Sequence, residues 1–234
     1  MKRILKILGI GIGLVLLIII ALLLINNESL PVGKEGAEAD ALAQKMLTAL
    51  NYEAYQTTRF LEWSYQGGKN QYKWDKAMGE STVNWEDYKV LLHLSNPERS
   101  TVLKGGKLLN GAEKNEAIEK ASAFFNNDSF WLVAPYKVFD KGTTRSIIEL
   151  KDGSQGLLVT YLSGGTTPGD SYLWKLNPDG SPKSYQMWVK ILPIGGLEAS
   201  WDDWMVAESG AFLPKSHKLG PIALSMGNVK GYND

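Results

Sequence analysis

Two histidines are the only residues of this 234-residue sequence with an ordinary pKa suited to acid–base catalysis near neutral pH. His93 lies in the alternating run 90–94, and His217 follows Pro214-Lys215-Ser216 near a predicted strand start. Serine-dependent hydrolysis needs a nucleophile beside such a base, but no G-x-S-x-G turn or comparable motif occurs. We therefore predict that both histidines are surface or turn residues and that the protein is not an enzyme. A serine and an acid beside either histidine in a cleft would reverse this prediction.

The remaining polar motifs do not have the spacing of a metal or phosphate site. No H-E-x-x-H motif or cysteine cluster occurs. The run 177–180, Asn-Pro-Asp-Gly, lacks the alternating oxygen ligands of a calcium loop and is predicted to be a hairpin turn. Asp202 and Asp203 are adjacent, so on a strand their carboxylates face opposite sides. Residues 104–107, Lys-Gly-Gly-Lys, lack the P-loop spacing. We predict no metal and no cofactor.

Tryptophan is the unusual component of this sequence. All eight tryptophans lie at or after Trp63. Large aromatic side chains on the concave face of a sheet are suited to binding an apolar ligand. The alternative is that these rings only fill the core between sheet and helices. The residues alone leave both interpretations open.

Charge and cysteine content exclude several other functions. The formal net charge is zero, and three of the 25 basic residues precede the apolar N-terminal stretch, leaving 22 against 25 acidic residues beyond it. A surface with this balance has no electrostatic preference for nucleic acid. Without cysteine the chain forms no disulfide and carries no lipid on an N-terminal cysteine, so any anchor must be the peptide itself.

Residues 7–25 form an apolar stretch of nineteen residues without a charge. At about 1.5 Å per residue, a helix of this length crosses the hydrocarbon core of about 30 Å. A cleaved signal peptide is the alternative, but its apolar region is about 7 to 15 residues and ends at small residues. Here Ile25 is followed directly by Asn26 and Asn27. We predict an uncleaved transmembrane signal anchor over 7–25.

The charges that flank this stretch predict its orientation. Lys2, Arg3 and Lys6 precede it, and Glu28 is the first charge after it. The positive-inside rule then places residues 1–6 in the cytoplasm. The predicted localisation is the inner (cytoplasmic) membrane, with a single pass and a C-terminal domain in the periplasm or another extracytoplasmic space.

The exported part divides into a tether and one domain. Residues 26–37 combine Asn, Pro, Gly and charges without periodicity and are predicted to be the tether. Residues 38–234 are long enough for one core. Apolar residues recur at three- and four-residue steps over 38–55 and over 112–126, which predicts two packing helices. A dense apolar run follows at 130–133.

Elsewhere apolar and polar residues alternate with the period of two that is typical of strands. Strands are predicted near 59–65, 72–74, 85–94, 101–104, 143–150, 156–163, 170–177, 183–192, 197–207 and 213–223. Glycine-rich turns separate them. The two helices must bury their apolar faces on this sheet, so the predicted fold class is α+β, a strongly curved antiparallel sheet with two packing helices.

Several local stretches carry a family resemblance. These are Gln71–Asp75, Asp128–Leu132 with Pro135–Lys137, and Trp201–Trp204 with Gly210–Pro214. Together with the order helix, strands, helix, strand meander, they resemble the superfamily of the lipoprotein carrier LolA and its receptor LolB. The resemblance covers about residues 38–224 and suggests a membrane-anchored bacterial member.

The resemblance implies an incomplete β-barrel, lidded by helices, over an apolar cavity that accepts acyl chains. The cavity residues that it implies are Trp74, Phe124, Phe130 and Trp131. The chain differs from the carrier by its predicted anchor and from the lipid-anchored receptor by its lack of cysteine. A fixed receptor or transfer station is therefore expected rather than a shuttle.

Two functional hypotheses follow from these observations. The first is a membrane-anchored extracytoplasmic binding protein for a lipid, a lipoprotein acyl chain or another apolar ligand, without catalysis. The second is an interaction module with a solid core that docks another envelope protein through exposed Trp and Tyr residues. A continuous apolar cavity favours the first and a filled interior favours the second, since one fold hosts many functions.

Overall fold

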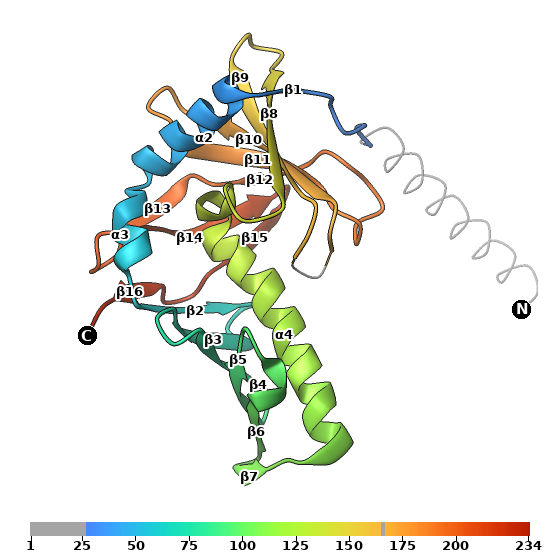
Figure 1. Ribbon diagram of the computed structural model, residues 1–234, viewed down its shortest axis with the longest axis vertical. Coiled ribbons are helices and arrows are strands. Elements are labelled where there is room, and N and C mark those ends of the chain that lie inside the picture. The colour runs from blue at the N-terminus through green and yellow to red at the C-terminus, as the bar shows by residue number, and fades with distance from the viewer. Residues whose placement is uncertain (1–26, 165–166) are drawn as a thin grey trace, which may run out of the picture.

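The computed structural model describes residues 27–164 and 167–234, and Figure 1 shows them as two β-sheets with a long helix beside both. The predicted cytoplasmic residues 1–6 and the predicted anchor 7–25 lie outside the described residues. Among the helices of the two described ranges, none combines the length and the apolar composition needed to cross a bilayer.

The two sheets, named sheet A and sheet B here, are antiparallel throughout. Sheet A has nine strands in the order β1-β8-β9-β10-β11-β12-β14-β13, with β15 beside β14. Its strands are β1 (Lys34–Glu35), β8 (Thr143–Glu149), β9 (Gln155–Tyr161), β10 (Asp170–Leu176), β11 (Pro182–Trp188), β12 (Leu197–Ser200), β13 (Asp203–Val206), β14 (Phe212–Leu219) and β15 (Ile222–Ser225).

Sheet B has seven strands in the order β16-β2-β3-β4-β5-β6-β7. They are β2 (Phe60–Tyr65), β3 (Asn70–Asp75), β4 (Glu80–Trp85), β5 (Tyr88–His93), β6 (Thr101–Lys104), β7 (Lys107–Leu108) and β16 (Lys230–Tyr232). A short 3-10 turn, η1 (Pro97–Arg99), connects β5 to β6.

The α+β class with antiparallel strands is confirmed, but the prediction of a single curved sheet was wrong. Apart from β1, which pairs with β8 of sheet A, the strands before helix α4 (Gly111–Val133) pair with one another in sheet B, and the strands after it form sheet A with one exception. Only β16 returns from the C-terminus to pair with β2. A period of two identifies strands but not their partners, so the sequence pattern did not separate the two sheets. Neither sheet closes into a barrel.

The first predicted helix, 38–55, is divided into α2 (Ala37–Ala49) and α3 (Tyr52–Thr57). Asn51 stands between them with a φ of 52°, in the left-handed region that asparagine tolerates better than most residues. Its side-chain amide donates a hydrogen bond of 3.1 Å to the carbonyl of Gly210. The break therefore ties the helix pair to the β13–β14 turn of sheet A.

Helix α4 is longer than predicted. The apolar run 130–133 forms its last turn, and the 3-10 turn η2 (Ala134–Lys137) follows directly. Ala121, Phe125 and Leu132 are buried along one side of the helix, at the helical spacing of three and four residues. The α-helix thus ends at Val133, two residues before Pro135.

Two predicted strands near the C-terminus are interrupted. The predicted strand 197–207 is divided into β12 and β13 at the fully buried Trp201, whose carbonyl accepts a 2.7 Å hydrogen bond from the Trp204 indole. The predicted strand 213–223 is divided into β14 and β15. The buried Trp201 keeps apolar alternation across the bend between β12 and β13, so the pattern did not reveal that interruption.

Burial of phenol groups is a further property of this fold. Burial raises the pKa of seven of the ten tyrosines above the ordinary value of about 10. These are Tyr55, Tyr65, Tyr72, Tyr136, Tyr161, Tyr172 and Tyr185.

We expect the free energy of unfolding to fall as pH rises above about 10. Above that pH the unfolded phenols lose protons that the folded ones retain, so each such tyrosine lowers stability by about 1.4 kcal/mol per pH unit. Guanidinium unfolding followed by tryptophan fluorescence at about pH 8, 10 and 11 measures the change. Phenolate absorbance of the native protein provides the control, and titration of all ten phenols near pH 10 would contradict the expected burial.

Candidate binding site

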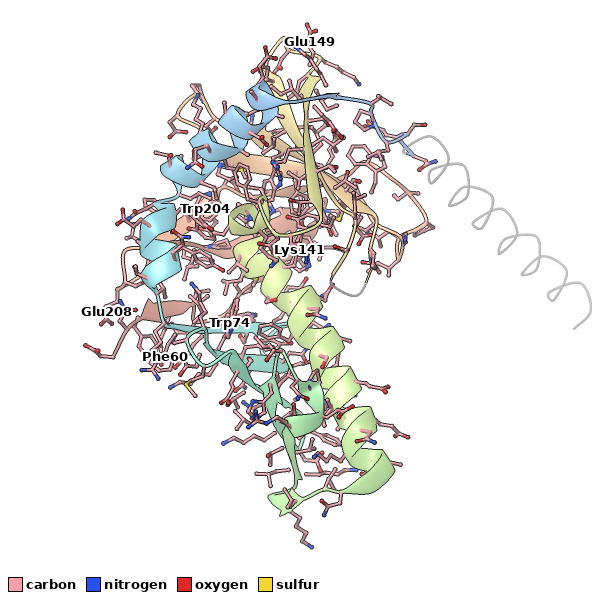
Figure 2. The ribbon with its side chains drawn as sticks, viewed as in Figure 1. Phe60, Trp74, Lys141, Glu149, Trp204 and Glu208 are labelled. Atoms are coloured by element: carbon pink, nitrogen blue, oxygen red, sulfur yellow. The ribbon has the colours of Figure 1, made fainter. Side chains whose placement is uncertain are left out.

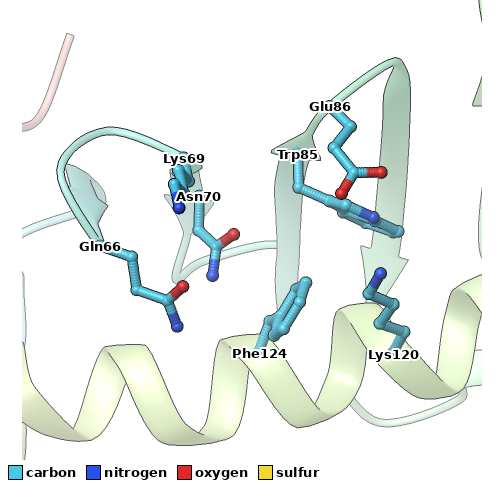
Figure 3. Close-up of a pocket in the computed structure, with 7 residues that line it drawn as sticks. All are labelled: Gln66, Lys69, Asn70, Trp85, Glu86, Lys120 and Phe124. Carbon is cyan, nitrogen blue, oxygen red and sulfur yellow. The ribbon is translucent and has the colours of Figure 1, made fainter. Parts of the chain in front are cut away.

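A cleft lies between helix α4 and two hairpin turns of sheet B, as Figure 3 shows. Its volume is about 570 Å³, within the range of about 300–1,000 Å³ that is common for small-molecule sites. The residues that line it are Gln66, Lys69, Asn70, Trp85, Glu86, Lys120 and Phe124.

The register of sheet B brings the strand residues of the cleft together. Asn70 at the start of β3 lies opposite Trp85 at the end of β4, and Trp85 lies opposite Tyr88 on β5. Directly opposite residues share one face of a sheet. On the helix, Lys120 and Phe124 are four residues apart and so stand on the same side. One wall of the cleft is therefore formed by Asn70 and Trp85 on neighbouring strands, with Tyr88 continuing the row beyond Trp85, and the other wall is one turn of α4.

Aromatic rings form the apolar part of this cleft. Trp85 stacks on Tyr88 with ring centroids 4.9 Å apart, and Phe124 meets Trp85 edge-on at 5.6 Å. The Lys120 ammonium lies 5.6 Å from the Trp85 ring and 5.5 Å from the Phe124 ring, within the range of cation–π attraction. Trp85 is only 4% exposed, so its ring is a fixed wall and not a mobile flap.

Charged side chains form the rim. Lys69 and Lys120 contribute two ammonium groups and Glu86 contributes one carboxylate. Within the part of the chain that the structure describes, none of the three lies within 4.0 Å of an oppositely charged group. An anionic group in the cleft would therefore meet two ammonium groups, neither in an ion pair, and one carboxylate, so the charged side chains of the cleft sum to plus one.

Behind the cleft, α4 carries a buried carboxylate. Asp128, one turn beyond Phe124, is 1% exposed. Its Oδ2 accepts hydrogen bonds from the Tyr72 hydroxyl and from Asn70 Nδ2 at 2.9 Å, and its Oδ1 accepts one from Asn127 Nδ2 at 2.8 Å. Burying a charge is costly unless hydrogen bonds satisfy it, and these donors satisfy both oxygens. Asn70 belongs to both groups, because it lines the cleft and binds Asp128.

The carboxylate affects the nearby phenols. Burial raises the pKa of Tyr72, and the charge of Asp128 raises it further. Burial also raises the pKa of Tyr65, and the charge of Asp128 raises it further. Tyr72 therefore remains a protonated donor throughout the physiological range, which keeps its bond to Asp128 intact. The hydrogen bonds of Asp128 hold Asn70 and Tyr72 of β3 in place behind the cleft. Both oxygens of Asp128 are occupied by donors, so the carboxylate is not a free base for the cleft.

The structure places the four residues implied by the family resemblance at three separate positions. Phe124 lines the cleft. Trp74, labelled in Figure 2, meets Phe125 edge-on at 5.2 Å on the side of α4 facing sheet B. Phe130 and Trp131 lie against rings of sheet A, and Trp131 also stacks on Tyr65 of sheet B at 6.5 Å. These four residues therefore do not line one common cavity.

Phe130 and Trp131 contact aromatic rings on the face of sheet A that packs toward α4. Phe130 lies 5.4 Å from Tyr161, and Trp131 lies 5.7 Å from Tyr185, between ring centroids. The hydroxyls of Tyr161 and Tyr185 are buried and have no hydrogen-bond partner among the described residues. An unpaired buried polar group is costly, so the packing of the surrounding rings must compensate for these two hydroxyls.

The prediction that His217 is a surface or turn residue was wrong. His217 is 1% exposed, with Nδ1 2.8 Å from the carbonyl of Ser200 and Nε2 2.7 Å from that of Trp131. Burial lowers the pKa of His217, while the two carbonyls and Asp202 and Asp203 raise it. Both ring nitrogens are occupied by backbone carbonyls, so the ring links α4 to sheet A and does not face a nucleophile.

His93 is half-buried and pairs with Glu80 through Nδ1 at 3.1 Å. Ser100 lies close by, but its Oγ accepts from the backbone N–H of His93, not from the ring. The arrangement lacks the contact from serine to imidazole that activates a nucleophile. Among the described residues, no group of three or more His, Asp or Glu side chains is placed to hold a metal ion.

No pattern in the sequence grouped Asp128 with Tyr72 and Asn70. A signal for Asp128 was present, since it follows Ala121 and Phe125 at helical spacing and so occupies an apolar stripe. Ending the predicted helix at residue 126 hid that signal. The pairing of Asp128 with two strand residues more than fifty positions earlier has no local signature.

Comparisons with known proteins add no family to this description. No protein-family model matches the chain, and no curated protein matches it significantly.

We expect Tyr72→Phe to lower the free energy of unfolding by about 1.5–3 kcal/mol, because it removes a hydrogen bond to a buried charge. Guanidinium unfolding of the full chain in mild detergent measures the loss. Tyr52→Phe is the matched control, since the Tyr52 ring is half-buried and stacks at 6.1 Å on Tyr136. The control should change stability by less than about 0.5 kcal/mol. Equal effects of the two changes would show that Asp128 does not depend on the Tyr72 hydroxyl.

Proposed function

We propose that this chain is a membrane-anchored extracytoplasmic binding protein, without catalysis, for an amphipathic lipid-like ligand such as a lipid or a lipoprotein acyl chain. The cleft beside α4 is the proposed site. The proposal extends to membership of the LolA/LolB-like superfamily, with sheet A as the counterpart of its strongly curved incomplete barrel. The order helix, strands, helix, strand meander supports that relationship.

The observation that carries the proposal is the combination of aromatic walls and unneutralised lysines in one cleft. Trp85 and Phe124 offer apolar surface, while Lys69 and Lys120 stand on the rim. Burying an acyl chain contributes about 0.8 kcal/mol per methylene, so a few methylenes against the rings add appreciable affinity. The two ammonium groups then favour an anionic head over a neutral one.

The membrane anchor is part of the same proposal. Residues 7–25 have the length and composition of a spanning helix, and Lys2, Arg3 and Lys6 precede them. An anchored protein does not diffuse across the envelope, so the proposed role is that of a fixed receptor or transfer station. Its location is the inner membrane with the described domain on the extracytoplasmic side.

A second candidate is a docking module for another envelope protein. The packing of Phe130 and Trp131 against the interior tyrosines of sheet A favours it, because rings that fill a core leave less room for a ligand. In that case half-buried rings such as Trp188 and Trp204 would contact the partner through their accessible edges, since no Trp or Tyr of the described residues is fully exposed. The binding measurement below separates the two functions.

We expect a short-chain phosphatidylglycerol to bind the full chain and to change the fluorescence of Trp85. Lys120→Ala should weaken binding about tenfold, equivalent to about 1.4 kcal/mol, because it removes one ammonium group from the cleft. Titration in detergent below the lipid's micelle concentration measures the affinity. Phe124→Ala should also weaken it by removing apolar contact.

Lys89→Ala is the matched control, since Lys89 is an exposed lysine of β5 that alternates with the cleft-facing Tyr88. It should leave the affinity unchanged. Absence of binding, or equal loss in Lys89→Ala and Lys120→Ala, would contradict the cleft as the site. Binding that is insensitive to all three changes would place the lipid elsewhere.

We expect the full chain to remain in the membrane pellet after alkaline carbonate extraction. A reporter that is active only outside the cytoplasm should be active when fused after Asp234, because the positive-inside rule places that end outside. A reporter that requires the cytoplasm is the control and should be inactive in the same position. Recovery of a soluble protein that begins near Asn26 would contradict the anchor.

A further inference from the structure

The segment that follows the proposed anchor is fixed to sheet A at both of its ends. At one end, β1 pairs with β8 through Lys34 and Ile147. At the other end, the Glu28 amide donates to the carbonyl of Gly195 at 3.0 Å, and the Trp188 indole donates to the carbonyl of Glu28 at 2.8 Å. Residues 27–35 are named the strap here. Figure 1 shows the strap running from α2 to the connection between β11 and β12.

The strap crosses the face of sheet A opposite to helix α4. Ser146, Leu158, Leu173 and Gln186 lie in one row across strands β8 to β11. The two leucines are 6% and 3% exposed, yet they alternate with the residues that face the main core. The strap touches both ends of this row, at Ser146 through Gly33 and at Gln186 through Glu28. It therefore covers the leucines.

Two glycines show how closely the strap is seated. A Cβ on Gly33 would lie 2.5 Å from the Ser146 hydroxyl oxygen and 2.7 Å from the carbonyl oxygen of Ile147. A Cβ on Gly195 would lie 2.3 Å from the Trp188 ring and 2.7 Å from the carbonyl oxygen of Glu28. All four distances are shorter than real Cβ contacts. Glycine is therefore required at Gly33 within the strap and at Gly195, where the other end of the strap is bound.

The strap ends very near the apolar stretch. Gly195 N donates to the Asn27 side chain at 2.8 Å, and only two peptide steps separate Asn27 from Ile25, the last residue of that stretch. Two steps span at most about 7 Å. The interfacial layer of a bilayer is itself about 5–8 Å thick on each side. The connection 189–196 therefore lies at the membrane surface if residues 7–25 span the bilayer.

Exposed apolar side chains gather at this end of sheet A. Ile191 is 69% exposed, Leu162 is 59% exposed and Phe139 is 42% exposed. They lie just beyond one end of sheet A, where the register places Thr143, Tyr161 and Trp188 at the ends of neighbouring strands. Isolated exposed apolar residues are ordinary, but a group at one end is typical of an interaction surface.

We propose that this end of sheet A, with Ile191 and Leu162 at its centre, rests on the lipid headgroup layer of the membrane that holds the anchor. The proposal depends on the anchoring proposed above. Apolar side chains gain free energy in the interfacial layer, and the short strap holds this surface close to the bilayer. The domain then stands in one orientation on the bilayer, with sheet A toward the lipid.

The absence of cysteine allows a direct test. A single Ile191→Cys variant of the full chain carries an environment-sensitive fluorophore in vesicles of phosphatidylethanolamine and phosphatidylglycerol that contain doxyl-labelled lipid. Leu108→Cys on β7 is the matched control, because Leu108 is an apolar residue that is 60% exposed and lies in sheet B. Leu162→Cys repeats the measurement at a second position of the surface.

The expected result is several-fold stronger quenching at positions 191 and 162 than at position 108. Equal quenching at all three positions, in protein that stays in the membrane pellet, would overturn the membrane-facing surface and leave the anchor standing. Protein that leaves the membrane altogether would overturn both proposals. Exposed positions tolerate such substitutions within about 0.5 kcal/mol, so misfolding is not expected at any of the three sites.

Discussion

Both sheets depend on the packing of one helix, and that helix carries a buried charge. Phe124, Phe125 and Asp128 of α4 face sheet B, while Phe130 and Trp131 face sheet A. A carboxylate in the middle of this interface is stable only where its donors are fixed, because an unpaired buried charge costs several kcal/mol. Asn70 and Tyr72 of β3 meet that requirement. These hydrogen bonds also set the distance between α4 and sheet B, and this distance determines the shape of the cleft.

The two sheets have different roles in the proposed function. Sheet B supplies the cleft, with Trp85 held between Tyr88 and Phe124. Sheet A supplies the attachment, because the strap crosses it and ends beside the connection 189–196. His217 joins these parts, since its ring reaches from β14 to the last turn of α4 through the carbonyl of Trp131. A shift in the position of α4 would therefore change its contacts with both sheets.

Local patterns in the sequence predicted most elements but not their assembly. The hairpin of β2 and β3 and most strands of the meander lie where alternation and glycine turns placed them. The division into two sheets was not predicted, because alternation identifies strands but not their partners, and neither was the pairing of β16 with β2 at opposite ends of the domain. The helix break at Asn51 was missed because the sequence pattern does not distinguish an asparagine in the left-handed conformation from a polar residue within a helix.

The candidate site was predicted only at Phe124. The family resemblance implied that residue, but most of the remaining lining residues come from two hairpin turns and a strand row that only the three-dimensional register brings together. His217 was misplaced because its surroundings are defined by backbone carbonyls on α4 and β12, which no side-chain pattern reveals. The strap was predicted to be a tether because its contacts also run through backbone atoms and glycines.

An experimental structure with a bound short-chain anionic phospholipid tests the central claim most directly. The account predicts that the acyl chain lies against Trp85 and Phe124 and that the phosphate lies within hydrogen-bond distance of Lys69 or Lys120. A lipid seated among the tyrosines of sheet A, beside Phe130 and Trp131, or a cleft that stays empty at saturating lipid, would contradict it.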